Sequence, residues 1–179
     1  MAAAGGEDKP KVEAWRPGAP VVQDRGISGL RAFAADYSGK SGAPALYALV
    51  DKVVGSKGQN ALQFATEAAH AVEVSGKSFT IKAKNGASLK ATVAAPAAAA
   101  ITAQSVTHTH EINYHGDHRA APFKRTLIEV KCADYALVVM TLQKGDAPAV
   151  QVTGEGPQAV ATVGGQTVSF DGKKIVIGR

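Results

Sequence analysis

The chain has 179 residues, of which 45% are hydrophobic and only 6% aromatic. This length fits one domain, or one domain and a tail, and it can bury a core without disulfide support. Lys and Arg number 20 and Asp and Glu 15, so the net charge of +5 favours polyanionic partners. The basic residues form no block, and no apolar run approaches the roughly 18 residues that span a bilayer, so neither nucleic acid nor membrane is an expected partner.

Residues 1–26 are predicted to form an irregular tail or linker, and residues 27–179 a single β-sandwich domain. The tail contains three prolines and mixed charge without periodicity. Trp15 is either a candidate ligand platform or a side chain that pins the tail to the domain surface. The first residues lack the basic start and apolar stretch of a secretion signal. We therefore expect a cytoplasmic protein, or a secreted or periplasmic domain if it is cut from a longer exported protein.

From Ile27 onward, apolar stretches alternate with turn signals at the spacing of an antiparallel β-sandwich, with two stacked sheets and about 12 short strands. Tyr135–Leu142 is apolar on both faces, as expected of a central strand covered on each side. Asn85-Gly86 and Asp171-Gly172 predict tight hairpins, because these residues tolerate positive φ. The predicted strands are Leu30–Tyr37, Ala45–Val54, Ala61–Thr66, Ala71–Val74, Phe79–Ala83, Ser88–Ala94, Ile101–Ile112, Phe123–Lys131, Tyr135–Gln143, Val150–Thr153, Ala159–Val163, Thr167–Phe170 and Lys174–Ile177.

Two features are interpreted as structural. Cys132 is the single cysteine and lies inside a strand pattern, so we expect a buried, inert thiol and no intramolecular disulfide. Residues 36–42, "DYSGKSG", look superficially like a phosphate-binding loop, but they lack its spacing and no helix follows. We interpret this segment as a hairpin loop.

The densest group of chemically active side chains lies in residues 107–119, "THTHEINYHGDHR", which hold four of the five histidines. In an extended strand His108 and His110 share a face, and such a pair is a common two-ligand unit for a transition metal such as zinc or copper. His115 and His118 are the candidates for completing the site. The alternative is that His108 and His110 line a half-covered strand face and that the residues after them form an exposed loop.

Tyr114, Arg119 and Arg125, together with Trp15, are the candidates for contacting a sugar ligand. Tyrosine and histidine could also act as base and proton donor in elimination from uronate sugars, with Tyr37 and Tyr114 as candidates. No pairing between these groups follows from the sequence. The alternative to an acid–base role is that these tyrosines are half-buried side chains whose hydroxyls are solvated.

Several short sequence segments occur in an order that is characteristic of one protein family. They include Leu49-Val50-Asp51-Lys52-Val53, the Asn85-Gly86 turn and the apolar strand Arg125–Val130, within stretches that read "RAFAADYSGKSGAPALYALVDKVVG" and "LQFATEAAHAVEVSGKSFTIKAKNGASLKATVAAPAAAAIT". From about Leu30 to Pro148, the chain resembles the C-terminal β-sandwich region of heparinase II/III-like polysaccharide lyases. The resemblance implies a carbohydrate-associated sandwich without the N-terminal helical toroid that forms most of the substrate cleft in such lyases. No catalytic residue of that family carries over to this chain.

Three functions follow as alternatives. The first is an accessory domain that is not catalytic alone, binds polysaccharide, in particular acidic polysaccharide, and works with a catalytic domain of a longer chain. The second is a small metalloenzyme that uses the histidine cluster to act on polysaccharide. The third is a structural or assembly module that binds neither glycan nor metal.

Overall fold

The computed structural model describes residues 26–56, 60–114 and 117–178. The expected tail, residues 1–26, lies outside this range except for Gly26. Within the described range the chain is built from strands and one 3-10 turn. The elements are β1 Ser28–Asp36, β2 Ala45–Val54, β3 Asn60–Glu67, β4 Ala71–Ser75, β5 Ser78–Lys82, β6 Ala87–Ala95, β7 Ala100–Tyr114, β8 Asp117–Cys132, β9 Tyr135–Lys144, β10 Val150–Thr153, η1 Gly156–Gln158, β11 Val160–Val163, β12 Gln166–Phe170 and β13 Ile175–Gly178.

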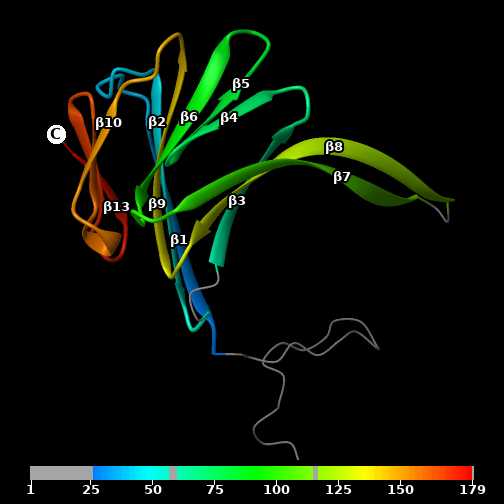
Figure 1. Cartoon of the computed structure of the whole chain (residues 1–179), viewed down its shortest axis with the longest axis horizontal. Coiled ribbons are helices and arrows are strands. Elements are labelled where there is room, and N and C mark those ends of the chain that lie inside the picture. The colour runs from blue at the N-terminus through cyan, green and yellow to red at the C-terminus, as the bar shows by residue number, and fades with distance from the viewer. Residues whose placement is uncertain (1–25, 57–59, 115–116, 179) are drawn as a thin grey trace, which may run out of the picture.

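These strands form three antiparallel sheets. The central sheet has the order β1-β2-β9-β6-β5-β4, the C-terminal sheet β10-β11-β12-β13 and the arm sheet β3-β8-β7. Figure 1 shows the central sheet between the other two, with β10 and β13 on one side and β3, β7 and β8 on the other. The all-β antiparallel prediction is confirmed. The expected pair of stacked sheets is corrected to three layers, because the middle strands of the central sheet are apolar on both faces.

Strand β9 explains this third layer. Its residues from Tyr135 to Thr141 are all buried, and it pairs with β2 on one side and β6 on the other. Leu137 and Val139 point into one core, while Val138 and Met140 point into the other. The prediction of a central strand covered on each face is confirmed.

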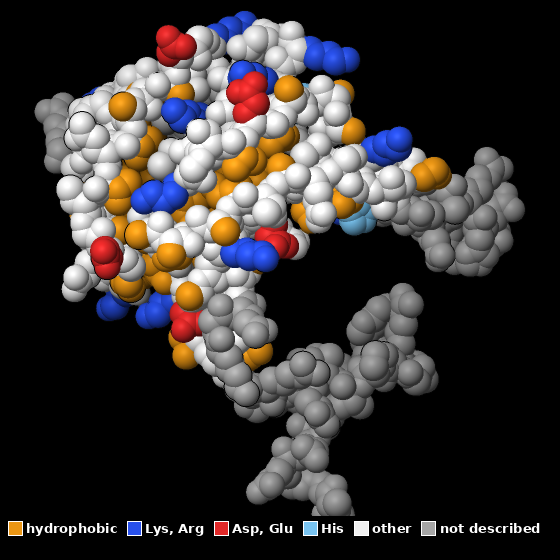
Figure 2. Space-filling model, in the orientation of Figure 1, with side chains coloured by type: hydrophobic (Ala, Val, Ile, Leu, Met, Phe, Trp, Pro, Cys, Tyr) orange, Lys and Arg blue, Asp and Glu red, His pale blue; other side chains and the backbone are white. Residues whose placement is uncertain are grey.

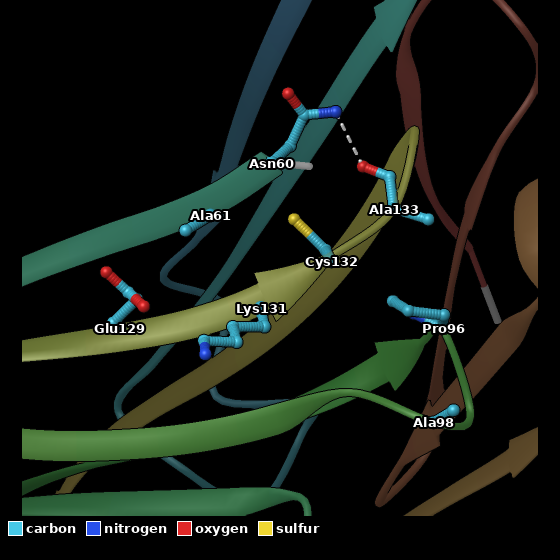
Figure 3. A pocket seen from close by; sticks show the side chains of 8 residues that line it. All are labelled: Asn60, Ala61, Pro96, Ala98, Glu129, Lys131, Cys132 and Ala133. Atoms are coloured by element: carbon cyan, nitrogen blue, oxygen red, sulfur yellow. Dashed lines mark hydrogen bonds between the residues drawn. The ribbon is translucent and has the colours of Figure 1, made fainter. Parts of the chain in front are cut away.

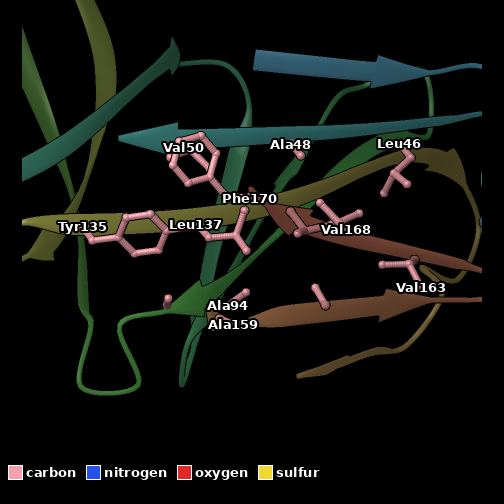
Figure 4. Close-up of a cluster of buried hydrophobic side chains, with 13 residues drawn as sticks. Leu46, Ala48, Val50, Ala94, Tyr135, Leu137, Ala159, Val163, Val168 and Phe170 are labelled. Carbon is pink, nitrogen blue, oxygen red and sulfur yellow. The ribbon is translucent and has the colours of Figure 1, made fainter. Parts of the chain in front are cut away.

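Two apolar cores hold the layers together. Figure 4 shows the C-terminal core, in which side chains of β2, β6 and β9 face those of β11 and β12. It consists of Leu46, Ala48, Val50, Ala94, Ala95, Tyr135, Leu137, Val139, Ala159, Ala161, Val163, Val168 and Phe170. The arm core lies on the opposite face of the central sheet and consists of Leu49, Leu62, Phe79, Ala91, Val93, Ile128, Val130, Cys132, Ala136, Val138 and Met140. Burying each large side chain contributes about 1.5–3 kcal/mol, so both interfaces contribute substantially to stability.

The predicted turns are present. In the β5–β6 hairpin Gly86 has φ +82°, and the side-chain Oδ1 of Asn85 accepts a hydrogen bond from the backbone N–H of Ala87 at 3.0 Å. In the β12–β13 turn the Asp171 carboxylate accepts the backbone N–H groups of Lys173 (2.9 Å) and Lys174 (2.8 Å), and these bonds lower its pKa. Residues 36–42 connect β1 to β2, as expected of a hairpin loop.

The largest departure from the sequence prediction is the hairpin of β7 and β8. These strands have 15 and 16 residues, and Tyr114 pairs with Asp117 at its far end, where an exposed loop was expected. Strand β3 pairs only with Arg125–Cys132 of β8, so the rest of the hairpin projects beyond the arm sheet. Figure 1 shows it extending away from the layers.

The described surface is mixed in character. Figure 2 shows hydrophobic side chains gathered in the middle of the visible face, with Lys and Arg spread around them rather than grouped in one block. Within the described ranges, no helix has the length and apolarity required to cross a membrane.

Candidate functional site

Three aromatic side chains form an exposed group on one face of β1 and β2. Phe33 is 62% exposed and Tyr37 is 70% exposed, which is unusual for large rings in a folded domain. The Phe33 ring stacks on that of Tyr47, with centroids 5.9 Å apart and planes at 23°. The Tyr37 ring meets Tyr47 edge-on, also at 5.9 Å, with planes at 82°. We call Phe33, Tyr37 and Tyr47 the aromatic patch.

Strand register places these rings together. Phe33 lies opposite Leu49, and Tyr47 lies two residues before Leu49 on the same face of β2, so Phe33 and Tyr47 are diagonal neighbours. Tyr47 packs against the arm core, whereas Ala32 of β1 packs against the C-terminal core on the other face. Strand β1 is an edge of the central sheet and contributes no buried side chain to the arm core. The arm sheet therefore leaves this edge of the face open.

An ion pair lies next to the rings. Arg31 is opposite Asp51 in the register and two residues before Phe33, so it is on the same face as the patch. Its Nε donates to Asp51 Oδ1 at 2.7 Å and its Nη2 to Oδ2 at 2.5 Å. The hydrogen bonds to Asp51 raise the pKa of Arg31 further above its ordinary value. The Arg31 side chain is 63% exposed, so this guanidinium is oriented but accessible.

The two tyrosines also interact electrostatically, and the proximity of Tyr37 raises the pKa of Tyr47 above its ordinary value. Each of these rings presents an apolar face beside a polar hydroxyl. A sugar ring has the matching character, since its axial C–H groups can pack on aromatic faces while its hydroxyls form hydrogen bonds at the edges.

The structure places two of the predicted site residues, His108 and Arg125, in contact. Arg125 Nη2 lies 2.8 Å from His108 Nε2, and the His108 ring stacks on Phe123 at 5.7 Å. Since an arginine can only donate, Nε2 is the acceptor in this contact. A metal at His108 would have to bind Nδ1 or displace Arg125.

The remaining predicted site residues lie outside the described part of the chain, either entirely or in their side chains: Trp15, His110, Tyr114, His115, His118 and Arg119. Backbone register alone places His110 opposite Ala121 and His118 opposite Asn113. Among the described residues, no three His, Cys, Asp or Glu side chains are grouped so as to hold a metal ion. The histidine metal site stays a prediction.

The two tyrosines considered for acid–base chemistry, Tyr37 and Tyr114, belong to different parts of the fold. Tyr37 follows β1 in the loop to β2, whereas Tyr114 ends β7 at the far end of the projecting hairpin. Figure 1 shows these two segments at opposite sides of the molecule.

A separate pocket of about 540 Å³ lies where β3 and β8 meet the turn after β6. Figure 3 shows Cys132 among its lining side chains, with the Asn60 amide donating to the Ala133 carbonyl at 2.8 Å on one side. Burial raises the pKa of the Cys132 thiol, and no histidine is among the residues that line the pocket. The expected burial of Cys132 is confirmed, and its raised pKa disfavours the thiolate, which is the reactive form of cysteine.

Sequence reasoning named Tyr37 but missed Phe33, Tyr47 and the Arg31–Asp51 pair. The available signal was alternation, because Arg31 and Phe33 fall on one face of a predicted strand. That signal does not reveal exposure, since a phenylalanine in a strand is usually buried. Recognising the patch required knowing that β1 is an edge strand and that the arm sheet stops short of it.

No family model matches the chain, and no curated protein matches it in sequence. Among solved structures it is similar to the crystal structure of heparan sulfate lyase HepC from Pedobacter heparinus, with 9% sequence identity and a TM-score of 0.44. The alignment covers 74% of this chain and 22% of that chain. This chain therefore spans less than a quarter of the lyase to which it is similar, and the likeness is a distant one.

Proposed function

We propose that this chain is a non-catalytic module that binds polysaccharide, in particular acidic polysaccharide, through the aromatic patch on β1 and β2. The observation that carries the proposal is the pair of solvent-exposed rings, Phe33 and Tyr37, held against Tyr47 beside a charged group. On this proposal the chain works with a catalytic domain that acts on the same polymer.

The character of the patch favours a sugar over an apolar partner. Two of its three rings are tyrosines that carry polar hydroxyls, and the Arg31–Asp51 pair borders the patch. A purely apolar protein partner would have to cover this ion pair and desolvate it, which costs free energy. A glycan instead offers hydroxyl groups that can replace water around these charges. The net charge of +5 favours polymers that carry acidic groups.

Binding is tested with the full chain by affinity electrophoresis in gels that contain polygalacturonate, alginate or a neutral galactan. We expect the wild-type protein to be retarded by at least one acidic polymer. Phe33→Ala and Tyr37→Ala should each weaken the retardation about fivefold or more, because stacking of a ligand ring on one exposed aromatic side chain is worth about 1–3 kcal/mol in the case of nucleobases.

Val74→Ala is the matched control, since Val74 is 41% exposed on β4 at the opposite edge of the same sheet. It should leave retardation unchanged. Absence of retardation of the wild type by every polymer, or unchanged retardation of both ring variants, would overturn the proposal. Release of unsaturated uronate from polygalacturonate or alginate by the purified chain would overturn its non-catalytic part.

A further inference from the structure

We infer that Arg31 is the residue that selects carboxylated sugars at this site: its guanidinium, held by Asp51, receives the carboxylate of a uronate unit while a neighbouring unit stacks on Phe33. This inference rests on the proposed function and specifies its ligand. It assigns recognition of the acidic group to the free N–H groups at the end of one guanidinium, rather than to the overall positive charge of the protein.

The geometry of the Arg31–Asp51 pair leaves the end of the guanidinium, with its two parallel N–H groups, available to a ligand. We call these two N–H groups the fork. A guanidinium has five N–H groups, and Asp51 accepts one from Nε and one from Nη2, along the side of the group. The end of the guanidinium, formed by Nη1 and the second hydrogen of Nη2, takes no further hydrogen bond from the described residues. The two remaining donors at that end are parallel and coplanar, which is the arrangement that binds a carboxylate bidentately.

Asp51 orients the fork. The Asp51 side chain is only 16% exposed, whereas that of Arg31 is 63% exposed, so the less exposed partner anchors the accessible one. A long side chain that is already fixed loses less rotamer entropy when it binds a ligand. The ion pair therefore prepares Arg31 for binding instead of occupying it fully.

The spacing suits a polymer. Arg31 and Phe33 are two residues apart on one strand face, about 7 Å, and the line continues past Tyr47 to Tyr37 over roughly 20 Å in all. A single sugar cannot contact both ends of this line. A chain of several units can place one carboxylate on Arg31 and ring faces on the aromatic patch.

The test compares polygalacturonate with its fully methyl-esterified form, which keeps the sugar rings and loses the carboxylates. Arg31→Gln should weaken binding of the full chain to polygalacturonate about tenfold or more, because a hydrogen-bonded charge pair is lost, and should change binding to the ester less than twofold. Lys82→Gln removes the same charge from a comparable surface ion pair, with Glu73, at the other edge of the sheet. It should change neither by more than twofold.

The outcomes separate the inference from the proposed function. If Phe33→Ala weakens binding to both polymers but Arg31→Gln acts no more strongly than Lys82→Gln, the glycan site stands and the role of Arg31 is wrong. If the wild type binds neither of these two polymers nor alginate, both are wrong. Dextran sulfate, which has no carboxylate, forms a third arm: binding to it with the same dependence on Arg31 would overturn the assignment to carboxylates.

Discussion

At the scale of single residues, the C-terminal core contains a buried tyrosine hydroxyl, that of Tyr135. The hydroxyl of Tyr135 is buried and makes no hydrogen bond to any described residue, and burial raises the pKa of Tyr135 to about 12. A buried polar group without a partner costs free energy relative to an apolar one of the same shape. Its ring contributes packing, with the Phe170 ring 6.2 Å away.

Tyr135→Phe is therefore expected to leave the protein as stable as the wild type or more stable, by up to about 1–2 kcal/mol. The pH dependence follows from the same burial. Above pH 10 an unfolded chain ionises this tyrosine while the folded chain keeps it protonated, so wild-type stability falls as the pH rises from 10 towards 12. Urea unfolding at pH 9 and pH 11 measures both effects.

The variant should show a smaller loss of stability between these two pH values than the wild type. Tyr37→Phe is the control, because that ring is exposed and its hydroxyl is not in the core. A Tyr135→Phe variant that is strongly destabilised at pH 9 would show that the hydroxyl has a partner after all.

At the scale of elements, the loop that carries Tyr37 is held by the C-terminal sheet. The Asp36 carboxylate accepts hydrogen bonds from Ser38 and from the Gln166 side chain of β12, and these bonds lower its pKa. Gly165 donates its backbone N–H to the Lys40 carbonyl at 3.2 Å. The turn between β11 and β12 therefore supports the end of the aromatic patch.

Gly164 in that turn allows this close approach. Its φ is +55°, and a Cβ atom there would lie 2.5 Å from the carbonyl oxygen of Ser41. We expect Gly164→Ala to destabilise the fold by about 2–4 kcal/mol, the sum of backbone strain and displacement of the loop. Gly86 also has a positive φ, but a Cβ atom there would meet nothing within 4 Å. Gly86→Ala should therefore lower the free energy of unfolding by only about 1 kcal/mol.

Urea unfolding monitored by circular dichroism compares these two glycine variants. Equal losses would show that the contact between turn and loop contributes nothing beyond backbone strain. Gly164→Ala should also weaken glycan retardation more than Gly86→Ala, since only the first lies against the loop that carries Tyr37.

The local sequence pattern of alternating apolar residues and turn residues predicted the strands closely. For β2 and β10 the predicted bounds are those of the structure. It did so because alternation and turn residues are local properties of the chain. The hairpin of β7 and β8 was predicted too short, since Gly116 and the polar residues around it suggest a loop when considered alone. Long-range pairing, which extends both strands to Tyr114 and Asp117, is not encoded in that local composition.

The candidate site was less predictable for the same reason. The sequence drew attention to the histidines, which are chemically distinctive, whereas the aromatic patch consists of ordinary strand residues. Its exposure follows from the position of β1 at the edge of the central sheet, which is a property of the assembled layers. Arg31 and Asp51, 20 residues apart, become partners only through the β1–β2 register.

At the scale of the whole molecule, one sheet supplies both cores. Strand β9 sends alternate side chains into the C-terminal core and the arm core, so neither interface can be lost without exposing a face of the same strand. Three layers that share a central sheet should therefore unfold together. Chains in which each layer had its own core would instead unfold in separate steps.

Leu137→Ala and Met140→Ala test this cooperativity, because the first opens the C-terminal core and the second opens the arm core. Each should lower stability by about 2–5 kcal/mol, as truncation of a large buried side chain does. Cys132 belongs to the arm core, so the reaction of its thiol with an aromatic disulfide reagent follows that interface alone. Circular dichroism follows all three sheets.

In each variant we expect thiol exposure and loss of circular dichroism to share one urea midpoint, with the slope of the transition unchanged from the wild type. The informative case is Leu137→Ala, in which the mutation and the thiol lie on opposite faces of the central sheet. If its thiol became reactive only at the wild-type midpoint, while part of the circular dichroism was lost earlier, the C-terminal sheet would be unfolding by itself. The shared central sheet would then not couple the two cores.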